Sequence, residues 1–197
     1  MTDRLKAQIG FIMEIDEMKN VLRRNLIKDG SRRENDAEHS WHLAVSAMVL
    51  SEYAGEKDTD ISHVLKLALV HDLVEVYAGD TFAYDTKGYE DKEQREKDAA
   101  DKLFSMLPDG QSEEFRALWD EFEENKTNES KFANALDRFM PLLLNYQTKG
   151  HTWKLQDNIT SESVYKRMEP IKTGMPEVWA VVEEIIEDSI RLGYLKK

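Results

Sequence analysis

Apolar residues recur three or four positions apart along almost the whole chain, which is the spacing of amphipathic helices. No segment shows the alternation of polar and apolar residues that marks a half-buried strand. Only four prolines and nine glycines interrupt the pattern. It predicts helices over about residues 4–22, 36–53, 63–77, 90–107, 112–125, 129–149 and 161–168, with a longer helix after Pro176. The predicted fold class is therefore all-α.

Polar residues mark the boundaries of several predicted helices. Asp36, Ser62 and Asn128 are residue types that cap helix N-termini, and each precedes an apolar run. The segments 23–35 and 79–88 are rich in charged residues and glycine, and we expect both to be loops.

The predicted helices differ in polarity. The first has an apolar stripe that includes Ile9 and Ile12. The helices over 90–107 and 112–125 carry many charges, and we expect them to face solvent.

Composition and charge narrow the choice of partners. The chain has 197 residues, enough for one full core, and 41% of them are hydrophobic. Its net charge is −12 and it has no basic run, so we expect no polymeric nucleic acid as a partner. A small anion remains compatible, because a bound metal and one or two arginines can outweigh a distant acidic surface.

The chain contains no cysteine, which removes disulfides and thiolate zinc sites and leaves histidine and carboxylates as the strong metal ligands. The N-terminal residues lack the apolar stretch of a signal peptide. No segment approaches the roughly 20 apolar residues that cross a bilayer. We therefore expect a cytoplasmic protein that makes no contact with membranes.

The segment from Val64 to Tyr77 combines burial with charge. It is apolar nearly all the way round, which is typical of a helix inside a protein. It nevertheless contains His71, Asp72 and Glu75. Unpaired charges in such a place cost several kcal/mol or more, so these side chains need compensation.

The same conflict occurs in two other apolar helices. The helix that starts at residue 36 contains His39 near its N-terminus, and the helix over 129–149 contains Asp137. One divalent cation bound by two imidazoles and two carboxylates would resolve all three conflicts. Such a nitrogen and oxygen set suits Mn, Fe, Co, Ni or Zn, and the pattern does not say which is native.

Each of these residues also has an ordinary interpretation on its own. A His-Asp dipeptide in a helix is common, Asp137 could pair with Arg138, and a histidine near a helix start can be hydrogen-bonded locally. Glu75, however, lies four residues after His71 and three after Asp72, on the helix face between them. A general acid or base needs that position beside a metal.

The order of these residues resembles the H…HD…D signature of the HD-domain phosphohydrolase superfamily, and the resemblance covers about residues 18–147. The closer match is to the branch that contains the 5′-deoxynucleotidases. It rests on four motifs: Ala37-Glu38-His39-Ser40-Trp41, His71-Asp72-Leu73-Val74-Glu75, Gly79-Asp80 and Ala135-Leu136-Asp137.

The resemblance implies a compact helical bundle with a metal site in its core, frequently dimeric. It implies one HD domain over residues 1–197, with the C-terminal helices at about 160–192 packed on the core. It also implies a small phosphorylated substrate, a nucleotide in this branch, whose phosphomonoester is hydrolysed.

The resemblance assigns roles residue by residue. The residues that match the metal ligands are His39, His71, Asp72 and Asp137. Glu75 matches the catalytic glutamate, and Asp80 matches the aspartate that holds substrate or the attacking water. Arg24 lies where the nucleotidases carry an arginine that contacts the nucleotide, and Arg32 in the same loop could also contact the phosphate.

One residue departs from the family pattern. In the bacterial nucleotidases a tryptophan that helps select the nucleotide follows the arginine, whereas Asn25 follows Arg24 here. The resemblance therefore supports the chemistry more than a preference for deoxynucleotides. A phosphodiesterase or nucleoside-triphosphate hydrolase of the same superfamily, and a non-catalytic metal- or ligand-binding module, are the alternatives.

Overall fold

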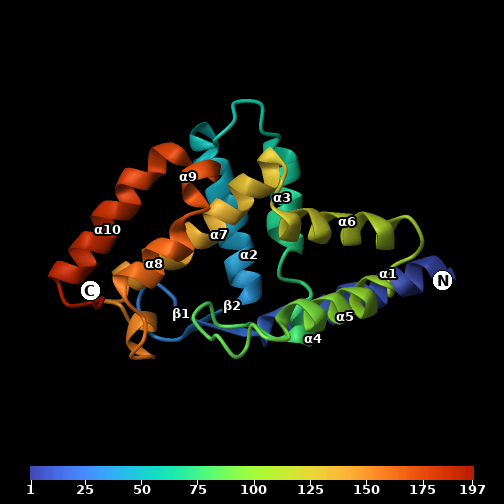
Figure 1. Cartoon of the computed structure of the whole chain (residues 1–197). Coiled ribbons are helices and arrows are strands. Elements are labelled where there is room, and N and C mark those ends of the chain that lie inside the picture. The colour runs from blue at the N-terminus through green and yellow to red at the C-terminus, as the bar shows by residue number, and fades with distance from the viewer.

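The computed structural model describes residues 1–197, and its centre is the 20-residue helix α7 (Asn128–Gln147). Helices from both halves of the chain surround α7, and β1 also contacts it (Figure 1). One cluster of 37 buried apolar residues forms the core and runs from Phe11 to Leu195. The predicted helical class is correct, with α7 as the element on which the others pack.

The first predicted helix is shorter than the pattern suggested. Helix α1 covers Asp3–Glu14, and a 3-10 helix, η1, follows over Ile15–Lys19. Much of the apolar stripe of α1 does not face the core, since Ile9 is 42% and Ile12 61% exposed. Helical periodicity identifies an apolar face but does not say which molecule covers it.

The segment predicted as a loop over 23–35 contains a small antiparallel hairpin, which corrects that prediction. Strand β1 (Leu22–Leu26) pairs with β2 (Arg33–Asn35). Arg23 is half-buried and Asn25 is buried, while Arg24 between them is exposed. The alternation is therefore present with polar residues on the inner face, and for that reason a search for apolar alternation missed the strand.

Helix α2 (Asp36–Val49) begins one residue earlier than predicted. Asn35 is its N-cap and forms a capping box with Glu38, in which each side chain bonds the other residue's backbone N–H. Asp36, the predicted cap, is instead the first helical residue and is fully buried. A short 3-10 helix, η2, follows over Ser51–Tyr53.

The predicted continuous helix over 63–77 is broken at the His-Asp pair. Helix α3 (Ile61–Val70) begins at the N-cap Asp60 rather than at Ser62, a turn follows it, and α4 (Glu75–Ala78) ends before Gly79. Through the turn, backbone N–H groups bond carbonyls three residues back, as from Glu75 to Asp72. The tighter turn places His71 and Asp72 at the end of one helix and Glu75 at the start of the next.

Helices α5 (Lys92–Phe104) and α6 (Gln111–Glu124) match their predicted positions closely. Both were expected to face solvent, but each buries one apolar face. The buried apolar residues of these faces are Ala99, Ala100, Leu103, Phe104, Leu118, Trp119 and Phe122.

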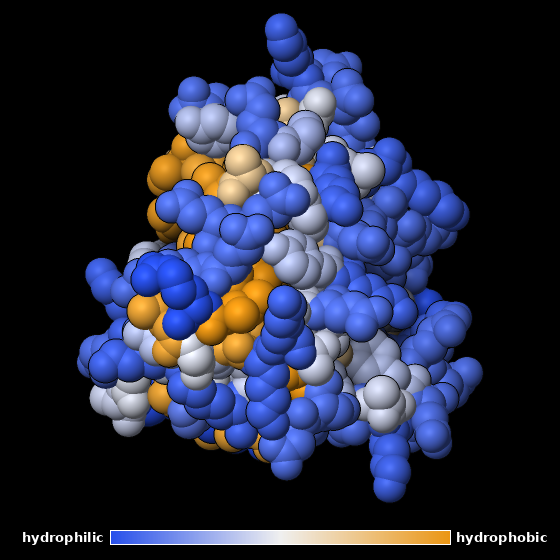
Figure 2. All heavy atoms as spheres, turned by 60° about the vertical axis from the view of Figure 1, so that its left-hand side comes forward, coloured by the Kyte–Doolittle hydropathy of each residue, from blue (hydrophilic) through white to orange (hydrophobic).

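The C-terminal quarter packs against α7 and joins the same core. Helix α8 (Ser161–Met168) lies where the sequence predicted it. The remaining elements are η3 (Thr152–Lys154), α9 (Ile171–Gly174), η4 (Pro176–Val178) and α10 (Trp179–Arg191). The side of the molecule on which α10 lies in Figure 1 is mostly hydrophilic, with hydrophobic areas between the charged side chains (Figure 2).

None of the helices has both the length and the apolar character needed to cross a membrane. The cytoplasmic location expected from the sequence stays a prediction.

Candidate active site

The structure brings the four predicted metal ligands together from three helices. His39 comes from the first turns of α2, His71 and Asp72 from the end of α3, and Asp137 from the middle of α7. His39 Nε2 lies 2.9 Å from Asp137 Oδ1, and His71 Nε2 lies 3.1 Å from Asp72 Oδ2. The two cross distances, from His39 to Asp72 and from His71 to Asp137, are both 3.9 Å.

The donor atoms of this cluster suit a metal ion. His71 Nδ1–H donates to the carbonyl of Ala68 at 2.9 Å, which directs Nε2 into the cluster. That Nε2 atom is buried and has no hydrogen-bond partner. Burial, followed by the charge of Arg23, lowers the pKa of His39 to about 4, so its imidazole is neutral as a ligand must be.

The two carboxylates of the cluster stay ionised in spite of burial. Burial alone would raise the pKa of Asp137, but Arg138 and His39 outweigh it and hold the pKa well below its usual range. Burial is likewise outweighed at Asp72, where His71 and Arg23 hold the pKa low. Two anionic oxygens and two imidazole nitrogens therefore converge on one buried point.

Arg23 is a site residue that the sequence did not single out. Its guanidinium donates to Asp72 Oδ2 at 2.8 Å and lies 3.4 Å from Asp36, 3.8 Å from Asp137 and 3.9 Å from Glu34. Its side chain is 11% exposed. Strand alternation was the signal that could have identified it, because Arg23 shares the inner face of β1 with Asn25.

A second group of carboxylates lies beside the first cluster. Oxygens of Asp36, Glu75 and Asp80 lie within 4.8 Å of one another. Burial and the nearby charge of Asp72 raise the pKa of Asp36 to about 7 and raise that of Glu75 well above its usual value. Asp36 Oδ2 and Glu75 Oε2 are buried without partners. These three groups could share protons or hold a cation.

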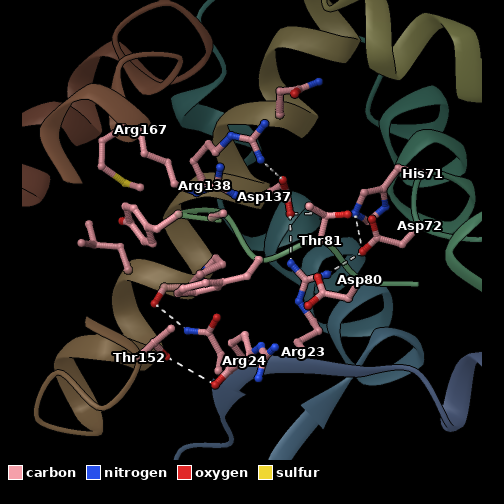
Figure 3. A pocket seen from close by; sticks show the side chains of 18 of the residues that line it. Arg23, Arg24, His71, Asp72, Asp80, Thr81, Asp137, Arg138, Thr152 and Arg167 are labelled. Atoms are coloured by element: carbon pink, nitrogen blue, oxygen red, sulfur yellow. Dashed lines mark hydrogen bonds and ion pairs between the residues drawn. The ribbon is translucent and has the colours of Figure 1, made fainter. Parts of the chain in front are cut away.

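A pocket of about 330 Å³ opens from these residues. His71, Asp72 and Asp137 line one side, and Thr152 and Arg24 lie on another (Figure 3). Aromatic residues from the segment after α4 and from η3 also line it: Phe82, Tyr84, Tyr89 and Trp153. The predicted loop over 79–88 thus forms one wall of the pocket. A cluster of residues that can bind a metal, with a cavity beside it for the substrate, is the arrangement that a hydrolytic site needs.

The two arginines that the sequence indicated as substrate contacts differ in their position relative to the pocket. Arg24 is exposed but lines the pocket, and its carbonyl accepts a bond from Thr152 Oγ1 at 3.5 Å. Arg32 pairs with Glu38 at 2.6 and 2.8 Å and is not among the residues that line the pocket. Asn25 lines the pocket and donates to the carbonyl of Pro141 at 3.3 Å.

The fold and the site define a helical protein with a buried histidine–aspartate cluster of the HD type. The HD domain family matches residues 15–179, and the chain therefore belongs to the HD domain family. The predicted family and the predicted fold class are confirmed.

Two proteins of similar sequence agree with this assignment. The 5′-deoxynucleotidase HDDC2 of Xenopus laevis is 30% identical over an alignment of 187 residues, which covers 93% of this chain and 88% of the relative. The human 5′-deoxynucleotidase HDDC2 is 29% identical and aligns with 91% of this chain and 85% of its own length.

A solved structure agrees as well. A predicted metal-dependent phosphohydrolase from Magnetospirillum magnetotacticum has a TM-score of 0.92 and 45% identity, with 100% of both chains covered. Together these findings confirm that the protein is a hydrolytic enzyme of this family that uses a divalent metal.

Proposed function

We propose that this protein removes the 5′-phosphate from nucleoside or deoxynucleoside monophosphates. The observation that carries the proposal is the convergence of His39, His71, Asp72 and Asp137 beside the buried Glu75 and an open pocket. The names of the relatives, 5′-deoxynucleotidases, support this substrate class.

His39, His71, Asp72 and Asp137 would hold one divalent cation. Their nitrogen and oxygen donors suit Mn, Co, Fe, Ni or Zn, and the choice among these depends on geometry and supply. Bound there, the cation would supply positive charge for the phosphoryl oxygens and lower the pKa of water at the site.

Glu75 would serve as the general acid or base. Its carboxyl is buried, has one unpartnered oxygen and carries a raised pKa, so it can hold a proton near neutral pH. It would accept a proton from the attacking water or deliver one to the leaving alkoxide.

Asp80 belongs to the second carboxylate group, with Asp36 and Glu75, and not to the first cluster. From that position it would orient the attacking water or a sugar hydroxyl.

The arginines at the hairpin would act on the phosphate in different ways. Arg24 lines the pocket and forms no ion pair, so its guanidinium is available to phosphate oxygens. Arg23 would act differently, because it already pairs with Asp72 and lies among four carboxylates. We assign Arg23 to positioning Asp72 and to offsetting the negative charge of the site. Arg32 would need to leave Glu38 to reach a substrate.

The experiment that tests the proposal is phosphate release from ribo- and deoxyribonucleoside 5′-monophosphates. The purified protein is stripped with a chelator, assayed, and assayed again after reloading with Mn or Co. We expect release that depends on the added metal. Because Asn25 stands where the bacterial enzymes have a tryptophan, the ratio of deoxy to ribo rates measures how far sugar selectivity departs from theirs.

Two other outcomes would replace the proposal. Release only from cyclic or dinucleotide diesters, or from triphosphates, would assign the protein to another activity of the superfamily. No turnover of any phosphate ester, with metal demonstrably bound, would favour a metal- or ligand-binding module. The buried and unpartnered Glu75 argues against that last function, because a purely structural site has no use for it.

We also propose that the protein forms a homodimer. Apolar side chains are exposed in stripes on two helices: Leu5, Ile9, Ile12 and Met13 on α1, and Trp41, Val45, Met48 and Val49 on α2. A stripe of this kind is typical of a face that another protein covers. The molar mass in solution, measured by light scattering for the native protein and for Trp41→Glu, tests this: a native monomer contradicts it.

A further inference from the structure

Two arginines line the pocket away from the His71–Asp72 side. Arg138 follows Asp137 on α7, and Arg167 belongs to α8. Figure 3 shows the two arginines next to each other, with His71 and Asp72 on the other side of the pocket. Two like charges that face one cavity repel each other, and an anion bound between them would offset that repulsion.

Arg167 has no anionic partner. It forms no ion pair and no hydrogen bond, and the groups that act on its charge do so only at a distance. Arg167 is half-buried, and it lies between the buried residues Val164 and Met168 in the sequence of α8. Burial, followed by the charge of Arg138, lowers its pKa. A half-buried cation has lost part of its hydration, and a bound anion would compensate that loss.

Arg138 has one partner, the carboxylate of Asp137. In the proposed enzyme Asp137 is also a metal ligand, so a bound cation would take up part of its negative charge. Arg138 would then have donors to spare for another anion, since a guanidinium carries five N–H groups. Arg116 and Arg191 differ, because each is paired with carboxylates near the surface.

Aromatic and apolar residues also line the pocket, and the charges of Arg167 and Arg138 both act on one of them, Tyr84. Trp153, which is 3% exposed, and Met168 are two others that line the pocket. Apolar surroundings strengthen the attraction between a guanidinium and an anion, because water competes less. They also suit the carbon skeleton of a small organic molecule better than a free inorganic ion.

We propose that Arg138 and Arg167 form a second anion-binding subsite, so that the natural substrate carries another acidic group besides the phosphate that is hydrolysed. That group is a phosphate or a carboxylate, both of which fit a guanidinium pair. This inference rests on the proposed phosphomonoesterase function for the position of the first phosphate.

The test compares esters that differ only in the second acidic group. Deoxyadenosine 5′-monophosphate is paired with its 3′,5′-bisphosphate, and hydroxyethyl phosphate is paired with carboxymethyl phosphate. We expect kcat/KM to be about 10- to 100-fold higher for the doubly acidic member of at least one pair, as charge-assisted hydrogen bonds would give. The pair that responds tells phosphate from carboxylate.

Variants assign the preference to the subsite. In Arg167→Gln the ratio of kcat/KM within the responding pair should fall to about 1, and Arg167→Lys should retain part of it. The matched control is Arg191→Gln on α10, whose arginine side chain is 72% exposed and outside the pocket, and it should keep the native ratio. Circular dichroism and thermal unfolding verify that each variant folds.

Two results would overturn the subsite. One is equal kcat/KM within both pairs for the native protein. The other is an equal loss on both members in Arg167→Gln, which would assign the arginine to the phosphate that is hydrolysed.

A binding measurement separates this inference from the proposed function. Calorimetry compares deoxyadenosine with deoxyadenosine 3′-monophosphate, and ethylene glycol with glycolate, none of which can be hydrolysed at a 5′-phosphate. Tighter binding of the acidic member that Arg167→Gln removes would support the subsite even if no ester were turned over. Turnover without such a difference would support the phosphomonoesterase and reject the subsite.

Discussion

The acidic end of the pocket, around Asp72 and Asp137, and the basic end, at Arg138 and Arg167, differ in how their charges are balanced. At the acidic end the carboxylates meet two imidazoles and Arg23 at distances from 2.8 to 3.9 Å. At the basic end Arg167 has no partner. The two ends meet on α7, where Asp137 and Arg138 are neighbours in the sequence.

This difference shows how one pocket can combine the chemistry that is common to the family with selectivity for the substrate of this particular enzyme. The acidic end is held in place by ion pairs from β1, α2, α3 and α7, so its geometry exists before anything binds. The basic end lacks its counter-ion, and the bound molecule would supply it. We therefore expect changes at the acidic end to abolish catalysis and changes at the basic end to alter selectivity.

Asp72→Ala should have the largest effect. It removes a proposed metal ligand and leaves the half-buried Arg23 without its closest partner. Losing one member of a buried pair costs about 3 to 5 kcal/mol of stability. We expect loss of bound metal, measured by elemental analysis, together with loss of turnover and a lower unfolding temperature. Asp98→Ala, on the exposed face of α5, is the control, and an Asp72→Ala protein that still binds metal would contradict the ligand assignment.

Glu75→Gln should separate chemistry from metal binding at the acidic end. The amide keeps the shape of the side chain but cannot exchange a proton. We expect kcat to fall by roughly 10²- to 10⁴-fold, the usual contribution of a general acid or base, while the metal content stays at the native level. The control is Glu124→Gln on α6. A near-native rate in Glu75→Gln would show that another group moves the proton.

The acidic end contains buried carboxyl groups that lack a full counter-charge. They should make the metal-free protein less stable at higher pH. The pKa of Asp36 is raised to about 7 in the folded protein, above its value in the unfolded chain. The folded state therefore binds more protons between these two pKa values, and stability falls as the pH rises through about 7.

Thermal unfolding of the chelated protein at pH 6 and pH 8 measures this effect. We expect a loss of about 1 kcal/mol for such a group over this range. Asp36→Asn should reduce the difference between the two pH values. A metal-free protein that is more stable at pH 8 than at pH 6 would contradict the explanation.

The smallest effect should come from Arg32, which tests its predicted contact with substrate. Its guanidinium pairs with Glu38 outside the lining of the pocket, whereas Arg23 contacts the acidic cluster directly. We expect Arg32→Gln to change kcat/KM by about twofold or less, as for other exposed ion pairs, and Arg23→Gln to reduce it far more. A larger loss in Arg32→Gln would place this arginine at the substrate after all.

Much of the acidic end could be predicted from the sequence. His39, His71, Asp72 and Asp137 stood out because each is a charged or ligand-forming residue in an apolar helix, and burial of such residues requires compensation. The helical class followed from the spacing of apolar residues, and the motifs identified the family before the comparisons confirmed it. These features are local, so each can be recognised within a few turns of chain.

The basic end and the role of Arg23 could not be predicted in this way. Arg167 is one basic residue among many in a charged segment, and nothing within α8 indicates that it lines a pocket with Arg138. Arg24 was named because it matches the arginine of the nucleotidases, and Arg23 was not singled out because the hairpin was not recognised. Strand alternation decides which of the two adjacent arginines points inward.

The sequence by itself determined the helical class, the family and the residues of the acidic cluster, because apolar periodicity and buried charge are properties of short segments. The tertiary structure alone decided which arginine enters that cluster, where the helix breaks at His71 and Asp72, and which side chains share the pocket. Those outcomes depend on contacts between residues far apart in the chain, such as Arg23 with Asp72, and only packing brings such residues together.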